Sequence, residues 1–325
     1  MLVLSATEVE SLLDLDALVE AIEAAMIDLS SGRASMPARV AALVPDRQAL
    51  LAAMPAFLPS AGALTTKLVS QFPQNEDRPS HQALICCFDP ETGTPVAIMD
   101  GTHVTALRTA AGSALASRLL ARPGASVVAV LGTGVQARAH ARLMVRLAGV
   151  RIIRVAGRNP LRVQHIVDEL VAAGVPAEAA DSIEDAVRSA DIVCGATHTD
   201  RPVVRYDWLQ PGTHVNSVGY NAAGAGEVDV ATIANSLVVV ESRSSALAAP
   251  PSGAIELRRA IDQGALDPDW VIELGEVAAD PSTGRIEDSQ LTLYKSVGVA
   301  VQDAAAAALV LRAAWERGVG IEISI

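Results

Sequence analysis

Two glycines with one residue between them, Gly132 and Gly134, end an apolar run typical of a buried strand and precede a helical pattern. In this strand–turn–helix context the first glycine permits a tight turn, the second lets a pyrophosphate approach the backbone, and Ala137 permits close packing of helix on strand. The free N–H groups at the start of the helix then bind the phosphates. The pattern therefore predicts a dinucleotide site, with first contacts at Gly132, Thr133, Gly134, Val135 and Gln136.

The residues after the second strand indicate which nicotinamide cofactor the site prefers. An Asp or Glu there would bind the ribose 2′-hydroxyl of NAD. The expected strand 152–156 is instead followed by Gly157, Arg158 and Asn159, with no carboxylate to repel a 2′-phosphate. The guanidinium fork of Arg158 suits such a phosphate. We therefore favour NADP(H), with Arg158 and Asn159 as contacts. NAD(H) is the alternative, in which Arg158 only flanks a turn.

Three cations occupy positions that suit a small anionic substrate. Arg39 begins an expected strand, Lys67 lies inside an apolar, Thr-rich strand, and Arg108 lies in the first turns of an expected helix. A buried cation without a partner is costly, so such residues should face a cleft or a partner. The structural alternatives are a surface strand position for Arg39 and a purely structural role for Lys67 or Arg108.

The composition excludes several classes of protein. A net charge of −12 over 325 residues argues against a nucleic-acid partner, which needs clustered Lys and Arg. Three cysteines, two of them adjacent, suit a reducing cytoplasm better than a disulfide framework. Neither a signal peptide nor an apolar run long enough for a membrane span is apparent. The six histidines show no metal-ligand spacing, so we expect no metal. A cytoplasmic protein that binds small molecules is the expectation.

The elements that must position these residues fall into two groups. Short strands at 39–44, 49–54, 63–69, 82–88 and 95–99 precede a helix at 104–120. Strands and helices then alternate from 126 to 241, which is typical of a parallel, doubly wound sheet. A strand near 290–294 and a last helix from about 297 to 317 follow. We expect an α/β protein with a Rossmann-type domain at 119–299. A second, α+β domain is expected at 1–118 and 300–325.

Four further segments resemble the ornithine cyclodeaminase/mu-crystallin family. They read Ala-Leu-Thr-Thr-Lys before Phe-Pro-Gln-Asn at 63–75, Thr-Ala-Leu-Arg-Thr-Ala-Ala-Gly at 105–112, Gly-Thr-His-Val-Asn-Ser-Val-Gly at 212–219, and Leu-Tyr-Lys-Ser-Val-Gly at 293–298 before Val-Gln-Asp at 301–303. The resemblance implies a homodimer whose first domain, completed by the C-terminal helix, binds substrate and dimerises. It also implies a nicotinamide cofactor that acts on small α-amino or α-imino acids.

The resemblance also implies roles for individual residues. Arg39, Lys67 and Arg108 match the cations that bind the substrate carboxylate, and Lys67 and Arg108 are the expected catalytic cations, with Lys67 as a proton donor. The remaining expected cofactor contacts are Thr109, Ala196, Thr197, Val218, Gly219, Ser296 and Gly298.

Two departures from the family pattern bear on the reaction. Cyclodeaminases carry an Asp where this chain has Asn221, and an amide is no general base near neutral pH. They also carry an acidic residue, which holds the distal amine, where this chain has Ala52. Both departures favour an imino-acid reductase. We still count Asn221 among the expected catalytic residues, together with Lys67 and Arg108. The alternatives are an ornithine cyclodeaminase that recycles NAD and a non-enzymatic NADPH-binding protein.

Overall fold

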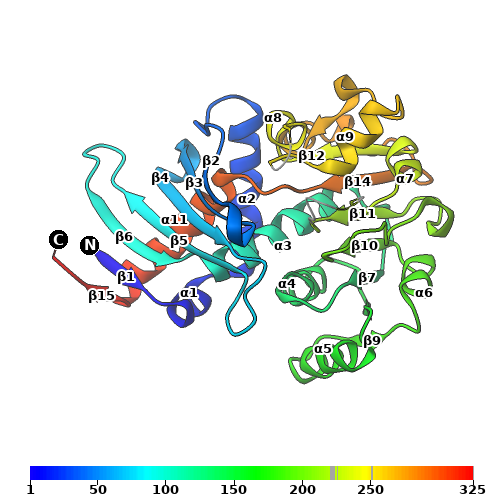
Figure 1. Ribbon diagram of the computed structural model, residues 1–325, viewed down its shortest axis with the longest axis horizontal. Helices are drawn as coiled ribbons and strands as arrows, with labels where there is room; N and C mark the ends of the chain where they lie inside the picture. Colours follow the sequence, from blue (N-terminus) through cyan, green and yellow to red (C-terminus); the bar gives the residue numbers. More distant parts are fainter. Residues whose placement is uncertain (220–223, 225, 250–251, 325) are drawn as a thin grey trace. The chain divides into compact units, whose positions relative to one another are not determined.

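The computed structural model describes residues 1–219, 224, 226–249 and 252–324 (Figure 1). The chain forms two compact units. Unit 1 comprises Met1–Arg108 and Gly298–Ile325, and unit 2 comprises Thr109–Val297. Helix α3 (Gly101–Leu120) continues from the first unit into the second.

Unit 1 is built on a seven-stranded sheet with the strand order β15-β1-β6-β5-β4-β3-β2. All neighbouring strands run antiparallel except β1 and β6, which are parallel. The strands are β1 (Leu2–Leu4), β2 (Val40–Val44), β3 (Ala49–Leu58), β4 (Ala63–Gln71), β5 (His81–Phe88), β6 (Pro95–Asp100) and β15 (Ile321–Glu322). The helices are α1 (Ala6–Leu12), α2 (Leu15–Ser30), α11 (Ala300–Arg317) and the start of α3.

One face of this sheet is buried and carries the first site residue. Helix α11 packs against β3 and β4, and α2 packs against α11. Alternate residues of β4 are buried, as expected for a strand with one covered face. Lys67 pairs with Met54 on β3 and Ile85 on β5, so these three side chains share the face toward α11. We call this the inner face and the opposite one the outer face.

Unit 2 is built on an eight-stranded parallel sheet with the order β13-β12-β14-β11-β10-β7-β8-β9. The strands are β7 (Val127–Leu131), β8 (Ile152–Ala156), β9 (Ala177–Ala179), β10 (Ile192–Gly195), β11 (His214–Ser217), β12 (Ser236–Val240), β13 (Ile272–Glu273) and β14 (Leu291–Lys295). The helices are α4 (Val135–Met144), α5 (Pro160–Ala172), α6 (Ile183–Arg188), α7 (Val230–Ala234), α8 (Arg243–Ala246), α9 (Ile255–Asp262) and α10 (Leu274–Ala279). The strand order reverses between β7 and β10, where ligands bind in such sheets. The predicted Rossmann-type sheet is confirmed.

Several predicted boundaries were wrong. Strand β3 continues to Leu58, although Pro55 reads as a strand end, because Pro55 still pairs with Thr66. Helix α3 begins at Gly101 rather than at 104, and α11 begins at Ala300 rather than near 297. Strands β1 and β15 were not predicted, since two or three residues carry no periodicity.

Within the described residues, no helix combines the length and apolar character needed to cross a membrane. That same part of the chain contains no group of three or more His, Cys, Asp or Glu side chains that could hold a metal ion.

Candidate functional site

Lys67 is buried on the inner face of unit 1, with only 2% of its surface exposed. Its Nζ lies 2.6 Å from Oδ2 of Asp303 on α11. It also donates a longer hydrogen bond, of 3.5 Å, to Oγ1 of Thr105. Burial lowers the pKa of Lys67 to about 8; the charge of Asp303 opposes this shift, and the charges of Arg108 and Arg39 add to it. The ammonium can therefore give up its proton near neutral pH.

Arg108 is held by the same carboxylate from another direction. Its Nε donates to Oδ1 of Asp303 at 3.0 Å, and its Nη1 donates to Oε1 of Gln302 at 2.9 Å. Gly298 has a φ of +76°, and a Cβ there would lie 2.9 Å from Nη2 of Arg108. A glycine at 298 therefore makes room for the guanidinium of Arg108, and the expected cofactor contact of Gly298 stays a prediction.

Arg39 lies one residue before β2 and is partly exposed. Its Nη2 donates to the carbonyl oxygen of Gly298 at 2.8 Å. Because its charge reaches Lys67, the structure brings Arg39, Lys67 and Arg108 together in unit 1. We call these three residues with Asp303 the cation cluster.

The cation cluster has more positive charge than its own acid can balance. Two cations contact the single carboxylate of Asp303, and Arg39 adds a third charge. On the described part of the chain, Nε2 of His81 and Nε2 of Gln302 are buried without a hydrogen-bond partner. Burial, followed by the charges of Lys67 and Arg108, lowers the pKa of His81, so this ring is near the cluster and neutral at pH 7. A small carboxylate would supply both the missing charge and hydrogen-bond acceptors.

Asp303 and Gln302 contact the predicted site residues, and sequence reasoning missed them. They belong to the 301–303 segment of the family pattern, yet no role was assigned to them. The carboxylate of Asp303 keeps its pKa below its usual range, since burial would raise it but the charges and hydrogen bonds of Lys67 and Arg108 outweigh that effect. Asp303 therefore holds the side chains of both Lys67 and Arg108 in place.

In unit 2, the turn between β7 and α4 has the geometry expected of a phosphate-binding loop. Gly132 has a φ of +119°, and a Cβ there would lie 2.6 Å from the carbonyl oxygen of Ala196. Gly134 caps α4 without a side-chain hydrogen bond, and a Cβ at Gly134 would enter open space. Thr133 is partly exposed, Val135 is exposed, and Oε1 of Gln136 is buried without a partner among the described residues. These features fit a dinucleotide pyrophosphate at the helix N-terminus.

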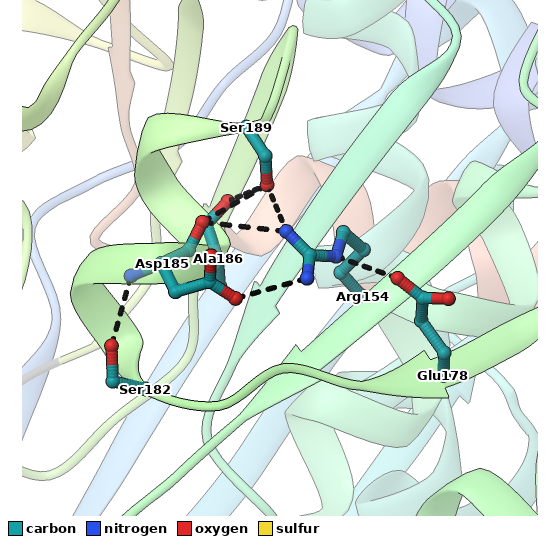
Figure 2. A network of polar contacts seen from close by, with 6 residues as sticks. All are labelled: Arg154, Glu178, Ser182, Asp185, Ala186 and Ser189. Carbon is teal, nitrogen blue, oxygen red and sulfur yellow. Dashed lines mark hydrogen bonds and ion pairs between the residues drawn. The ribbon is translucent and has the colours of Figure 1, made fainter.

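The end of β8 presents one exposed cation. Arg158 is exposed and follows the strand by two residues. Its neighbour Asn159 caps α5, with Oδ1 accepting a hydrogen bond from the N–H of Arg162 at 3.2 Å. Arg154, inside β8, is already bound by other residues. Figure 2 shows its guanidinium between Glu178, Asp185 and Ser189. Arg158 is therefore the cation on this segment that a 2′-phosphate could recruit.

Most predicted contacts at the carboxyl ends of the other strands are engaged in internal hydrogen bonds. Thr197 donates both its N–H and its hydroxyl to Oε1 of Glu227, and the N–H of Gly219 donates to Oε2. The hydroxyl of Ser296 donates to Glu241 at 2.5 Å. The remaining residues are placed as follows: Val218 donates its N–H to the carbonyl oxygen of Gly195, Thr109 is buried in α3, and Asn221 lies outside the described residues.

Glu227 was not predicted as a site residue. Asp229, two residues later, caps α7, and its side chain accepts a hydrogen bond from the N–H of Thr232. A lone Glu outside any helix or strand pattern carries no such local signal.

Comparisons with known proteins agree on one family. The model of the ornithine cyclodeaminase/mu-crystallin family matches residues 1–318. The chain is 34% identical to the ketimine reductase mu-crystallin of Mus musculus over 321 residues, 97% of each chain. Among solved structures, it is similar to the Δ1-pyrroline-2-carboxylate reductase of Thermococcus litoralis in complex with NADH and L-proline, with a TM-score of 0.93, 33% identity, and coverage of 99% of this chain and 100% of the other. It is also similar to an archaeal alanine dehydrogenase dimer with bound NAD, with a TM-score of 0.91, 31% identity, and coverage of 100% and 99%.

Proposed function

This chain belongs to the ornithine cyclodeaminase/mu-crystallin family, and on that premise we propose that it is an NAD(P)H-dependent oxidoreductase of small α-imino and α-amino acids, of the ketimine reductase type. Unit 1 binds the substrate, and unit 2 binds the cofactor. The observation that carries the proposal is the cation cluster, in which Lys67 and Arg108 share the carboxylate of Asp303 and Arg39 lies nearby. Next to it, Nε2 of His81 and Nε2 of Gln302 have no hydrogen-bond partner among the described residues.

The chemistry follows from these groups. When bound, the reduced nicotinamide supplies the hydride that adds to the carbon of the substrate C=N bond. Arg108 and Arg39 hold the substrate carboxylate, and the guanidinium of Arg108 is already oriented by Asp303 and Gln302. Lys67 delivers a proton to the imine nitrogen, a role for which a pKa of about 8 is suited. Hydride on carbon and proton on nitrogen together give the amino acid.

The substrate has no distal amine. Ala52 is buried on the inner face of β3, where it pairs with Val69, and it offers no charge. Asp303 is already occupied by Lys67 and Arg108. Asn221 cannot serve as a general base. These residues favour an imine reductase over a cyclodeaminase.

The preferred cofactor is NADP(H). The support is Arg158, which is exposed after β8 with no carboxylate on either side of it. Two relatives were solved with NADH or NAD, so NAD(H) is the alternative outcome of a titration.

The protein forms a homodimer through the outer face of the unit 1 sheet. Val40, Leu51 and Leu84 are exposed on that face by 72%, 50% and 50%. Val40 pairs with Ala53 on β3, which puts the exposed side chains of neighbouring strands on one apolar surface. A second copy is the occupant that the dimeric archaeal relative favours. Sedimentation should show a dimer, and Leu84→Glu combined with Leu51→Glu should give a monomer.

We also place the protein in the cytoplasm. Its cysteines, Cys86, Cys87 and Cys194, are all free thiols, which suits a reducing compartment.

The test of the activity is a reduction assay with purified protein. NADPH and NADH are each supplied with Δ1-pyrroline-2-carboxylate, Δ1-piperideine-2-carboxylate, and pyruvate with ammonia, and oxidation of the cofactor is followed by absorbance. We expect reduction of at least one imine, with Lys67→Met inactive while it still binds the cofactor. Release of proline and ammonia from L-ornithine without net cofactor oxidation would identify a cyclodeaminase instead. Cofactor binding with no reaction on any substrate would identify a binding protein.

A further inference from the structure

A buried carboxylate in unit 2, Glu227, gathers the ends of two neighbouring strands. Its Oε1 accepts the N–H of Thr197 at 2.7 Å and the hydroxyl of Thr197 at 2.6 Å. Its Oε2 accepts the hydroxyl of Ser217 at 3.0 Å and the N–H of Gly219 at 2.9 Å. Thr197 follows β10, and Gly219 follows β11. A single side chain thus joins the two segments at the ligand-binding edge of the sheet.

Two glycines leave the space that this carboxylate occupies. A Cβ at Gly195, the last residue of β10, would lie 2.6 Å from the Glu227 carboxyl group. A Cβ at Gly219 would also lie 2.6 Å from it. Both strand ends are therefore shaped around Glu227.

Lys295, the last residue of β14, completes the arrangement. Its Nζ donates to the carbonyl oxygen of Gly219 at 2.8 Å and to the hydroxyl of Ser217 at 3.2 Å. It also lies 2.9 Å from Oε1 of Glu256. Gly219 is thereby held at its N–H by Glu227 and at its C=O by Lys295.

We propose that Glu227, with Lys295, is a positioning residue that fixes Thr197 and Gly219 for the nicotinamide end of the cofactor. The inference rests on the proposed function, because it presumes that the carboxyl edge of β10 and β11 receives the nicotinamide ring. The phosphate-binding turn of Gly132 and Gly134, which would hold the pyrophosphate, makes none of the hydrogen bonds described for Glu227. We therefore expect a change at Glu227 to weaken binding of the nicotinamide half of the cofactor more than binding of the adenosine half.

The test compares NADPH and NADH with ADP-ribose and its 2′-phosphate, which lack the nicotinamide ring. In Glu227→Gln, an amide N–H₂ replaces an acceptor oxygen and faces two donors, so the Thr197 or the Gly219 segment must move. We expect the Kd for the full dinucleotide, measured by fluorescence, to rise about tenfold or more, and the Kd for the ring-less nucleotide to change less than about twofold. Gly195→Ala, which displaces the same carboxylate, should reproduce this pattern.

Asp191→Asn is the matched control. Asp191 accepts the N–H groups of Ser126 and Val127 and pairs with Arg122 at the amino end of the same sheet. The Asp191→Asn variant should have a lower melting temperature, and any change in Kd should be the same for the full dinucleotide and the ring-less nucleotide. An equal loss for both nucleotides in Glu227→Gln, or no loss, overturns the inference. If Glu227→Gln does not fold, Ser217→Ala takes its place, because it removes one hydrogen-bond donor to Glu227 and changes no charge. This variant must then weaken binding of the full dinucleotide more than binding of the ring-less nucleotide, with a smaller difference. A wild-type protein that binds no dinucleotide would overturn the proposed function instead.

Discussion

Lys67 in unit 1 and Lys295 in unit 2 are both buried ammonium groups, exposed by 2% and 1%, yet their surroundings differ. Lys67 shares the carboxylate of Asp303 with Arg108, and Arg39 adds further positive charge. Lys295 lies among hydrogen-bond acceptors and pairs with Glu256, and its charge also reaches Glu227.

The difference suggests that the cation cluster binds a ligand, whereas the residues around Lys295 support the fold. In the cation cluster, positive charge exceeds negative charge, and polar atoms of His81 and Gln302 have no partner among the described residues. Around Lys295, the carboxylate of Glu227 is met by four hydrogen-bond contacts from its own unit. A buried cluster with excess charge is costly unless a ligand completes it, whereas both oxygens of the Glu227 carboxylate already have hydrogen-bond donors within unit 2.

The largest expected effect is the loss of kcat/KM on substitution in the cation cluster. Arg108→Gln removes the buried charge that we propose holds the substrate carboxylate, and it leaves Asp303 with Lys67 alone. Loss of one partner of a buried, hydrogen-bonded charge pair costs about 2–5 kcal/mol, so kcat/KM should fall by roughly 30- to 5000-fold. Steady-state kinetics measure this loss, with cofactor affinity as the control that should stay unchanged. A loss below about fivefold would mean that Arg108 is structural.

Replacing each lysine by methionine tests the comparison directly. Lys295→Met leaves Glu256 buried without its cation and should lower the free energy of unfolding by about 3 kcal/mol or more. Lys67→Met leaves Asp303 paired with Arg108 and relieves the excess of positive charge, so stability should change by less than about 1 kcal/mol. Urea unfolding of the cofactor-free variants measures both. Equal destabilisation by the two variants would contradict the distinction.

The sequence allowed prediction of the parts of the site whose signal is local. The Gly132–Gly134 turn and the helix start at Val135 follow from glycine chemistry within a few residues. The three cations were identified because each lies in an expected strand or helix, where a buried charge without a partner is costly, and because they match the family pattern.

The partners of these residues were not predictable because they come from distant segments. Arg108 and Asp303 are 195 residues apart in the chain, and nothing near either residue indicates the other. Glu227 likewise contacts Thr197 and Gly219 only because the parallel strands β10 and β11 end side by side in the folded sheet. Gly298 was expected beside a cofactor, but its contact with Arg108 becomes apparent only in three dimensions.

The pH dependence of the reaction sharpens the assignment of Lys67. Its pKa of about 8 means that the proton donor is lost as the pH rises through 8, so the reduction rate should fall on the alkaline side. Asp303 raises the pKa of Lys67, so Asp303→Asn should move this alkaline limb to lower pH by about one unit. Profiles of kcat between about pH 6 and pH 10 measure the shift. An unchanged limb, or one at higher pH, would exclude Lys67 as the titrating donor.

The smallest expected effect lies at the end of β8, outside both clusters. Arg158 is exposed, so its contact with a 2′-phosphate is partly screened by solvent. Arg158→Ala should weaken NADPH binding by about tenfold and leave NADH binding within about twofold. The NADPH loss should shrink at high salt, because an exposed ion pair is weakened by screening. Arg162→Ala, in the first turn of α5, is the matched control and should change neither affinity. Equal losses for both cofactors in Arg158→Ala would show that the guanidinium contacts a part of the dinucleotide common to both, and the preference for NADP(H) would then be wrong.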